Sequence, residues 1–590
     1  MWIKNIIRFC LFSICLHGLL PAYTFTDHQG RQFDGDLLGV TAEGQVTIRR
    51  HSDQVTFQLK ASLFSQEDRD YFREWLKNPS RNLAQSSYRL KDGEAIRALP
   101  RQLRVDLIWE AGDLPHYEVA RATQANGPWA VLPNPTPEFH LYSDYIGSAG
   151  QQYFYRVRNV RLSKSGEVVE SAAWSDVVDA TTLPYERNAF VSELQEACVR
   201  FYFEAAHPVS GLSPEGAPGW GGVSAVGSSG MGMANIIVGV HRGFVSREQG
   251  VAQALKMLRF LDQKTEKQAG AFAHWMDGAT GAPRGFGSNG KAADLVETSF
   301  LIQGAILLRE YFDGPSANER EIGEIATRLA AGVQWPTFIV DRSEGPVMMW
   351  HWDAENGVSD LPIRGFHEAM MPYILAIGSD SNPVDAESFA SGWYHPQHGL
   401  GERREHFGIE HTLGRGIGWP LFFAHYSHIG FDPRAIRYDG QTYFEHFEAA
   451  TKVHEAYAHS RADEFKGYDK VWGLAASMSP FGYKAHHPGR SDTGTIATTA
   501  ALSSMPYFPE AVLDCMETMY LEYGDQIWGC FGFYNAFNPT ENWVVNKYIG
   551  IELGPIAPMI ENHRSGLLWK LFMQAPEVKR AQARIAAYSK

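Results

Sequence analysis

The spacing of apolar residues changes from alternation to a helical period near residue 185, and this change limits the folds open to the chain. Phe190, Leu194, Cys198 and Phe201 recur every three or four residues, which places side chains on one face of an α-helix. About twelve such tracts follow before the C-terminus. The pattern predicts an all-α region over 185–590. Periodicity leaves paired helices around a cleft, a bundle and a solenoid open, but no fixed-length repeat supports a solenoid.

The chain before residue 185 alternates with a period of two, which is typical of β-strands. Residues 23–60 form short alternating pieces separated by turn residues, and 96–183 contains longer ones. Ser65, with Asp68 three residues later, is placed to cap a short helix that closes the first group. The polar stretch 79–95 between the two groups predicts a linker.

Each group of predicted strands resembles a known small domain. The segments FTDHQGRQFDGDLLGV and FSQEDRDYFREWL resemble an SH3-like barrel over 23–78. The strands of 96–184, with Trp109 as the expected core tryptophan and a late strand at Tyr155, resemble a fibronectin type III sandwich. The first resemblance implies either binding of protein or cell wall or a stabilising appendage. The second implies a spacer.

The first 22 residues have the features of an export signal. Lys4 and Arg8 precede an apolar stretch over 9–20, and Ala22 ends a small-residue cleavage site. The stretch is shorter than the roughly 20 residues that a membrane span needs. We therefore expect cleavage after residue 22, a secreted or periplasmic protein, and no membrane association after the signal is removed.

The charge balance and the cysteines exclude several classes of protein. The chain has 53 Lys and Arg against 67 Asp and Glu, a net charge of −14. It lacks the clustered cations that nucleic acid requires. Cys198, Cys515 and Cys530 remain after signal removal and form no CxxC pair, so zinc is not expected. We expect Cys198 to be a buried thiol, and a bridge between Cys515 and Cys530 stays open.

Three carboxylates are catalytic candidates because of the residues around them. Asp294 and Glu297 are three residues apart at the start of an apolar helix, and are expected on one helical face. They either support the helix dipole or face a cleft. Glu368 lies in a glycine- and aromatic-rich turn before another apolar helix. Desolvation there would raise the pKa of a carboxyl group and suit a general acid; a carboxylate that only supports a helix start is the alternative.

Aromatic residues interleave with polar ones in the segments 274–277, 350–353 and 468–473. A sugar site needs aromatic faces beside hydrogen-bonding groups, whereas the alternative is that these rings only cap a helical core. The sequence contains no nucleophile elbow, P-loop or strand-placed dinucleotide motif. Its paired histidines, such as His486 and His487, come with no recognisable ligand set. We therefore expect a polysaccharide or oligosaccharide substrate, no metal and no cofactor.

Five long motifs resemble the glycoamylase domain of the bacterial β-1,2-glucanases of glycoside hydrolase family 144. In order they are DLVETSFLIQGAILLREYFDG, GFHEAMMPYILAIGS, LFFAHYSHIGFDPR, DTGTIATTAALSSMPYFPE and ELGPIAPMIENHRSGLLWKLFM. The likeness spans about 190–580. It implies an (α/α)6 toroid with a cleft at one end and inverting cleavage of β-1,2-linked glucose chains.

The same resemblance implies roles for individual residues. Glu368 falls where the family has its general acid, and Asp294 and Glu297 are expected to contact substrate or water. An inverting pair stands roughly 6.5–9.5 Å apart, which leaves the general base open among Asp492, Glu297 and Glu552.

The chain departs from the family pattern at two positions, and further motif residues are subsite candidates. Glu552 opens Glu-Leu-Gly-Pro where the family has Asp-Gln-Gly-Pro, and His367 replaces an asparagine. A side chain one methylene longer at residue 552 would displace any water that it holds, which leaves the linkage that is cleaved open. The subsite candidates are Trp275, Arg364, His425, Tyr426, Trp472, Tyr483, Asn562 and Arg564. A structural ion pair at a helix start is an equal alternative for Arg564.

The leading hypothesis is a secreted glycoside hydrolase acting on a β-linked glucan, most specifically β-1,2-glucan. One alternative is a polysaccharide lyase, for which His425 and Tyr426 offer a base. Another is a glycan-binding protein without activity. The sequence leaves endo and exo cutting open.

Overall fold

The computed structural model describes residues 23–27, 29–40, 45–50, 56–76, 90, 93–220, 222–395, 401–489 and 491–588. The chain divides into two compact units, Met1–Ser86 and Ser87–Lys590. The expected export signal and most of the expected linker lie outside the described residues. Within the described part of the chain, no helix is both long and apolar enough to cross a membrane.

The first unit is a four-stranded antiparallel sheet closed by one helix. The sheet follows the order β1 (Tyr23–Thr26), β2 (Gln32–Val40), β3 (Gln45–Arg50) and β4 (Thr56–Lys60), and α1 (Gln66–Leu76) follows it. The Ser65 side chain accepts a hydrogen bond of 3.1 Å from the Asp68 amide, which confirms the predicted cap. The small core contains Phe25, Val46, Ile48, Phe64 and Phe72.

The second unit begins with two antiparallel sheets. One has the order β5 (Ile96–Arg101), β6 (Arg104–Trp109) and β9 (Leu141–Tyr145). The other has the order β11 (Val168–Ser171), β10 (Gln152–Leu162), β7 (His116–Ala122) and β8 (Ala130–Val131), and β12 (Val178–Thr181) also pairs with β10. Trp109 lies in the core formed with Val105, Leu107, Tyr117 and Tyr155, which confirms its predicted place.

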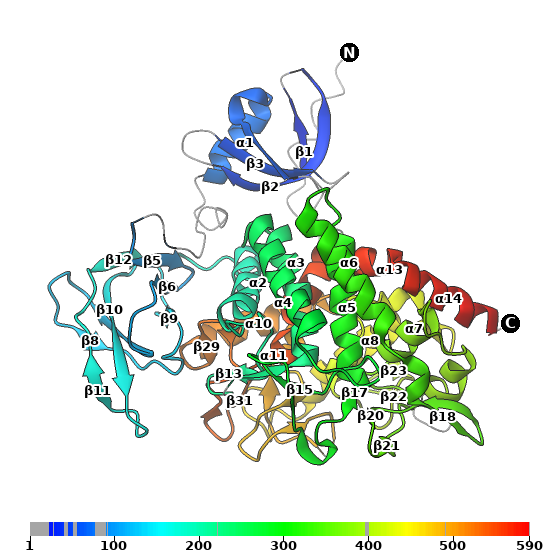
Figure 1. Ribbon diagram of the computed structural model, residues 1–590. Helices are drawn as coiled ribbons and strands as arrows, with labels where there is room; N and C mark the ends of the chain where they lie inside the picture. The colour runs from blue at the N-terminus through cyan, green and yellow to red at the C-terminus, as the bar shows by residue number, and fades with distance from the viewer. Residues whose placement is uncertain are drawn as a thin grey trace. The chain divides into compact units, whose positions relative to one another are not determined.

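A helical region fills the rest of the second unit, as the periodicity predicts (Figure 1). Its helices are α2 (Arg187–Glu204), α3 (Val226–His241), α4 (Arg247–Gln263), α5 (Leu295–Tyr311), α6 (Ala317–Gly332), α7 (Met371–Gly378), α8 (Tyr443–Ser460), α9 (Thr498–Leu502), α10 (Pro509–Ile527), α11 (Gly550–Leu553), α12 (Ile556–Ser565), α13 (Leu567–Gln574) and α14 (Pro576–Tyr588). Cys198, Cys515 and Cys530 are buried free thiols, so the expectation for Cys198 is confirmed and the open bridge is not formed.

Short strands occupy the loops between these helices. They are β13 (Gly216–Ala217), β14 (Val223–Ala225), β15 (Trp275–Asp277), β16 (Pro283–Arg284), β17 (Ala293–Asp294), β18 (Ile339–Arg342), β19 (Gly345–Met348), β20 (His351–Asp353), β21 (Gly357–Val358), β22 (Arg404–His406), β23 (Ile409–His411), β24 (Arg437–Tyr438), β25 (Gln441–Thr442), β26 (Ala476–Ser477), β27 (Lys484–Ala485), β28 (Ile496–Ala497), β29 (Trp528–Gly529), β30 (Gly532–Phe533), β31 (Ala536–Asn538), β32 (Trp543–Val544) and β33 (Tyr548–Ile549). Figure 1 shows β13, β15, β17, β20 and β31 at the same end of the helices.

Helices α3 and α5 cross at a pair of glycines. A Cβ atom on Gly304 would lie 2.3 Å from the Gly230 carbonyl oxygen, and one on Gly230 would lie 2.3 Å from the Phe300 carbonyl oxygen. No real side chain tolerates such distances, so only glycine permits this approach. Nearly every residue of both helices is buried, and the two therefore form an inner pair.

A buried charged cluster joins the two-sheet region to the helices. Arg104 of β6 contacts Glu193 of α2 at 2.7 Å and Asp106 at 3.1 Å. Its guanidinium also lies over the Trp528 ring, 4.6 Å from the centroid. Arg101 pairs with Glu196 at 2.8 Å in the same cluster. All five of these charged side chains are nearly inaccessible to solvent, so their mutual pairing compensates for their burial.

Candidate active site

Four inner helices begin directly after a short strand. Strands β14, β17, β28 and β33 end at the residue before α3, α5, α9 and α11 respectively. The first turn of a helix carries N–H groups without partners in that helix, which favour negative charge. Three of the predicted site carboxylates, Asp294, Glu297 and Glu552, lie at or within the first turn of α5 and α11.

Asp294 is the N-cap of α5 and therefore does not share a helical face with Glu297, which corrects the expectation. Its carboxylate accepts hydrogen bonds from the amides of Val296 and Glu297 at 3.1 and 3.0 Å. His274 Nδ1 lies 2.9 Å and His351 Nε2 3.4 Å from the other oxygen. Burial acts to raise the pKa of Asp294, but its two histidine partners hold it well below the usual range. Asp294 is thus an anion whose oxygens are already occupied by protein groups.

His274 connects Asp294 to the other carboxylates. Burial acts to lower its pKa, but the charge of Glu297 and the contact with Asp294 raise the pKa to about 9. The ring stacks on Phe286 at a centroid distance of 3.7 Å. His274 is therefore an oriented imidazolium at neutral pH.

Glu297 reaches from α5 to the start of α3. Its Oε2 accepts a hydrogen bond of 2.7 Å from the Gly227 amide, an amide in the first turn of α3. A Cβ atom at residue 227 would lie 2.3 Å from this oxygen, so glycine is required for the contact. Burial raises the pKa of Glu297, the charge of His274 opposes the rise, and the charges of Asp294 and Glu215 add to it.

Glu552 lies at the start of α11 and is 1% exposed. The Tyr483 hydroxyl donates to Oε1 at 2.7 Å, and the Asn535 amide donates to Oε2. Burial raises the pKa of Glu552 to about 8 against these two hydrogen bonds, and the charge of Glu215 contributes to the rise. The two donors thus hold the Glu552 carboxyl group in one orientation.

Glu215 is a half-buried carboxylate that the sequence analysis missed. Its Oε2 accepts a hydrogen bond of 2.8 Å from Trp275 Nε1. The next residues, β13, pair with β33, which leads into the helix that carries Glu552. Burial raises the pKa of Glu215. The Trp275 ring packs against Trp220 and Phe286 at centroid distances of 5.9 and 4.9 Å, which gives this side of the site an aromatic wall.

Glu368 lies on the loop before α7, with 18% of its side chain exposed. Its backbone carbonyl accepts a hydrogen bond of 2.5 Å from Ser427, next to Tyr426. Burial raises the pKa of the Tyr426 hydroxyl, and the charges of Glu552, Glu368 and Glu297 raise it further. The charges of three predicted carboxylates therefore act on one phenol.

The remaining predicted residues have other surroundings. Asp492 accepts hydrogen bonds from the Tyr468 hydroxyl at 2.7 Å and the Gly494 amide at 2.9 Å. These bonds stabilise the loop that contains Asp492. The Arg364 guanidinium lies 3.1 Å from Glu344. Arg564, in the last turn of α12, donates to side chains of α2, including Gln195 at 2.6 Å. These contacts are structural, but they are hydrogen bonds to neutral groups and not the ion pair at a helix start that the sequence suggests.

Three further subsite candidates are packed in the core. His425 is fully buried and contacts Ser504 at 3.0 Å. Trp472 is 1% exposed, and the Asn562 amide donates to the Ile429 carbonyl at 2.9 Å. No sugar reaches these side chains in this conformation, because protein groups surround them.

The sequence placed His274 and His351 in two of the candidate sugar-binding segments, 274–277 and 350–353, without a role of their own. It gave no sign of Asn535, because no local sequence pattern marks this residue and only the folded chain brings it to Glu552. Among the described residues, no group of three or more His, Cys, Asp or Glu is placed to hold a metal ion.

Closely packed carboxylates of shifted pKa beside an aromatic wall are what a glycoside hydrolase requires. Residues 360–576 match the family described as "Putative glucoamylase". A curated relative is the exo β-1,2-glucooligosaccharide sophorohydrolase (non-reducing end) of Parabacteroides distasonis, 34% identical over 508 residues, which are 82% of this chain and 69% of that protein.

Solved structures agree with this assignment. A β-1,2-glucanase from Parabacteroides distasonis superposes with a TM-score of 0.78 and 32% identity, over 84% of this chain and 73% of the other. An endo-β-1,2-glucanase from Chitinophaga pinensis superposes with a TM-score of 0.64 and 34% identity, over 68% of this chain and 98% of the other. The chain is a glycoside hydrolase and belongs to the family that contains the sophorohydrolase.

Proposed function

We propose that this enzyme hydrolyses β-1,2-linked glucose chains by single displacement with water, which inverts the anomeric carbon. The observation that carries the proposal is that Glu297, Glu368 and Glu552 all lie close enough to Tyr426 for their charges to raise the pKa of its hydroxyl. Inverting hydrolysis needs one carboxyl group to protonate the leaving oxygen and a second to activate water. The relatives named above act on β-1,2-linked glucans or their oligosaccharides.

Glu368 is the proposed general acid and Glu552 the proposed general base. Glu368 keeps 18% of its side chain exposed, so a glycosidic oxygen can reach it. Both oxygens of Glu552 accept hydrogen bonds that favour the ionised form. Because burial still raises its pKa to about 8, Glu552 is ionised, as a base must be, above that pH. Asp294 fixes His274, and we assign it a positioning role rather than direct contact with water.

Exo cutting is the proposed mode of action. The relative described as exo-acting aligns over 82% of this chain, whereas the endo-acting structure covers 68%. The difference between these two covered fractions of the chain is roughly the length of the two-sheet region. The similarity to the exo-acting relative therefore extends beyond the helical region.

Chromatography of the products from linear β-1,2-glucan tests the proposal, with starch as the control substrate. A single short product that accumulates from the first time point is expected. A ladder of oligosaccharides would replace exo by endo cutting. Hydrolysis of starch alone would overturn the β-1,2 linkage, and binding without any product would favour the glycan-binding alternative.

The lyase alternative has little support in the site. His425, which would be part of its base, is fully buried, and burial lowers its pKa to about 3. A base must reach the proton that it removes, and this side chain lies inside the core.

We also propose the finer architecture that the sequence suggests. Helices α3, α5, α9 and α11 each begin directly after a short strand, and this shared arrangement supports an (α/α)6 toroid. The sheet orders of 23–78 and 96–184 are compatible with an SH3-like barrel and a fibronectin type III sandwich. Residues 1–22 are proposed to direct export to the periplasm or medium, where a polysaccharide substrate is available. Mass spectrometry of the N-terminus after expression in a bacterial host tests the cleavage.

A further inference from the structure

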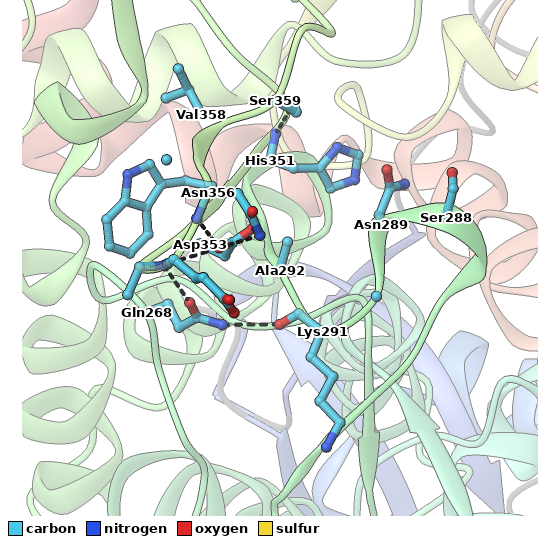
Figure 2. A pocket seen from close by; sticks show the side chains of 15 residues that line it. Gln268, Ser288, Asn289, Lys291, Ala292, His351, Asp353, Asn356, Val358 and Ser359 are labelled. Atoms are coloured by element: carbon cyan, nitrogen blue, oxygen red, sulfur yellow. Dashed lines mark hydrogen bonds between the residues drawn. The ribbon is translucent and has the colours of Figure 1, made fainter.

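A pocket of about 600 Å³ opens beside the candidate active site. Two segments line it: the loop 288–292, and the hairpin of β20 and β21 with the residues around it, 351–359. Figure 2 shows Ser288 and Asn289 on one side of the pocket and Gln268 and Asn356 on the other. The volume is within the range of about 300–1,000 Å³ that small-molecule sites occupy.

The pocket adjoins the carboxylates through one imidazole ring. His351 lines the pocket, is paired with Asp294 across β17 and β20, and places Nε2 3.4 Å from that carboxylate. Trp350 stacks with His351 at 6.2 Å and with His367, the neighbour of Glu368, at 5.8 Å between centroids. A chain bound at Glu368 therefore has the pocket nearby, on the far side of Trp350 and His351.

The pocket is held in shape by its own hydrogen bonds. Asp353 Oδ1 accepts from the amides of Glu355 and Asn356 at 2.9 and 2.6 Å. Gln268 connects the two segments, donating to the Lys291 carbonyl at 3.0 Å and accepting from the Ala354 amide at 3.2 Å. A preformed pocket binds a ligand without a large ordering cost.

The chemistry of the lining suits a neutral polyhydroxylated ligand. The half-buried Trp352 offers an aromatic surface, and the exposed Asn289 offers an amide that both donates and accepts. The Asn356 amide nitrogen donates to Asp353 at 3.1 and 3.2 Å, so Asn356 offers its side-chain oxygen as an acceptor. Lys291 lines the pocket from one segment, and Asp353 and Glu355 line it from the other. The lining therefore carries charges of both signs, which does not favour a ligand of one charge. Aromatic and amide groups together match the apolar faces and hydroxyl edges of a glucose ring.

We propose that this pocket is a remote glucosyl subsite, which binds a sugar unit of the substrate chain away from the bond that is cleaved. The inference rests on the proposed function, because it requires a glucan to cross the carboxylates. It predicts that longer chains are better substrates, since only they reach the pocket.

The test compares kcat/KM for β-1,2-linked gluco-oligosaccharides of increasing length in the wild type and in variants. Asn289→Trp fills the pocket from an exposed loop, and Asn289→Ala removes only an amide. Asn318→Trp is the matched control, because Asn318 is an exposed amide on α6 outside the pocket. Thermal unfolding of each variant excludes loss of fold.

In the wild type, kcat/KM is expected to rise with chain length. Asn289→Trp is expected to lower the ratio of kcat/KM for long over short chains by about tenfold, the equivalent of roughly 1.4 kcal/mol. Asn289→Ala should lower it less, and Asn318→Trp should leave it at the wild-type value. An equal effect of Asn289→Trp on all lengths, or none, with an active wild type would overturn the subsite alone. An inactive wild type at every length would overturn the proposed function and the subsite with it.

Discussion

The Tyr483 hydroxyl donates a hydrogen bond of 2.7 Å to Glu552 Oε1, although Tyr483 is 57% exposed and Glu552 is buried. One side chain thus joins the surface to an interior carboxyl group. Its ring, like that of Phe481, which is 68% exposed, is available for stacking on a sugar. A substrate that covers the Tyr483 ring also covers the contact that stabilises ionised Glu552.

Replacing this tyrosine is expected to move the pH profile upward. Tyr483→Phe removes a donor that lowers the pKa of Glu552, so the pKa rises above about 8. If ionised Glu552 is the base, the ascending limb of kcat/KM should move to higher pH by about one unit, since a hydrogen bond to a charged group contributes about 1.5–3 kcal/mol. Tyr588→Phe, at an exposed position near the C-terminus, is the control. An unmoved ascending limb would contradict the role of Glu552.

Replacing Glu215 is expected to move the same limb in the opposite direction. The charge of Glu215 raises the pKa of Glu552 and of Glu297, and Glu215→Gln removes the charge while its amide oxygen still accepts from Trp275. The ascending limb of kcat/KM should therefore move to lower pH. Shifts of the same sign in Tyr483→Phe and Glu215→Gln would show that the limb does not belong to Glu552.

Glu368→Gln is expected to abolish turnover without loss of fold. Glutamine has nearly the same shape but cannot donate the proton, and general acid catalysis is typically worth 10²–10⁴-fold. The measurement is product formation from β-1,2-glucan together with thermal unfolding. Glu510→Gln, an exposed acid in the first turn of α10, should retain wild-type activity. Residual activity of Glu368→Gln within about tenfold of the wild type would remove Glu368 from the acid role.

Asp294→Asn is expected to lower the pKa of His274 while preserving the cap of α5, because asparagine caps helices as well as aspartate does. Contact with Asp294 helps to raise that pKa to about 9. A pKa raised on folding gives stability that is complete below the unfolded value near 6.5 and is lost as pH rises through 9. The variant should lose less stability over this interval. Deuterium exchange at the ring C2 position, read by mass spectrometry, gives the pKa directly; an unchanged value would contradict the electrostatic link.

Arg104→Met is expected to destabilise the second unit strongly. It leaves Glu193 buried opposite a neutral side chain, and removal of one partner from a buried pair costs about 3–5 kcal/mol. The midpoint of thermal unfolding should fall well below that of the wild type. Arg161→Met is the matched control, because the pair of Arg161 with Glu170 is about half exposed and such pairs contribute about 0–1 kcal/mol. Equal midpoints for both variants would show that the cluster does not hold the sheets to the helices.

The sequence predicted the features that depend on near neighbours. The helical period, the Ser65 cap and the core position of Trp109 all follow from residues close together in the chain, and the structure agrees with them. The position of Glu297 in the first turn of α5 was also accessible, because an apolar helix follows it in the sequence.

Features that depend on distant segments were not accessible. Glu215 lies near Glu552 because β13 pairs with β33, and no local pattern signals that pairing. His425 lies in a motif rich in aromatic and polar residues, yet it is buried against Ser504, because the same residue types serve a core and a sugar cleft equally well. Asp294 was placed within the helix rather than at its cap because capping depends on where the strand before it ends.

The close approach of Gly230 and Gly304 in the core sets a distance in the active site. Gly304 lies seven residues beyond Glu297 on α5, about 10 Å along the axis, and the glycine pair fixes how far apart α3 and α5 stand. The same separation sets the 2.7 Å contact between Glu297 and the Gly227 amide. A methyl group added at the crossing would push the two helices apart and lengthen this contact, a hydrogen bond that lowers the pKa of Glu297. Activity therefore depends on two glycines that do not contact the substrate.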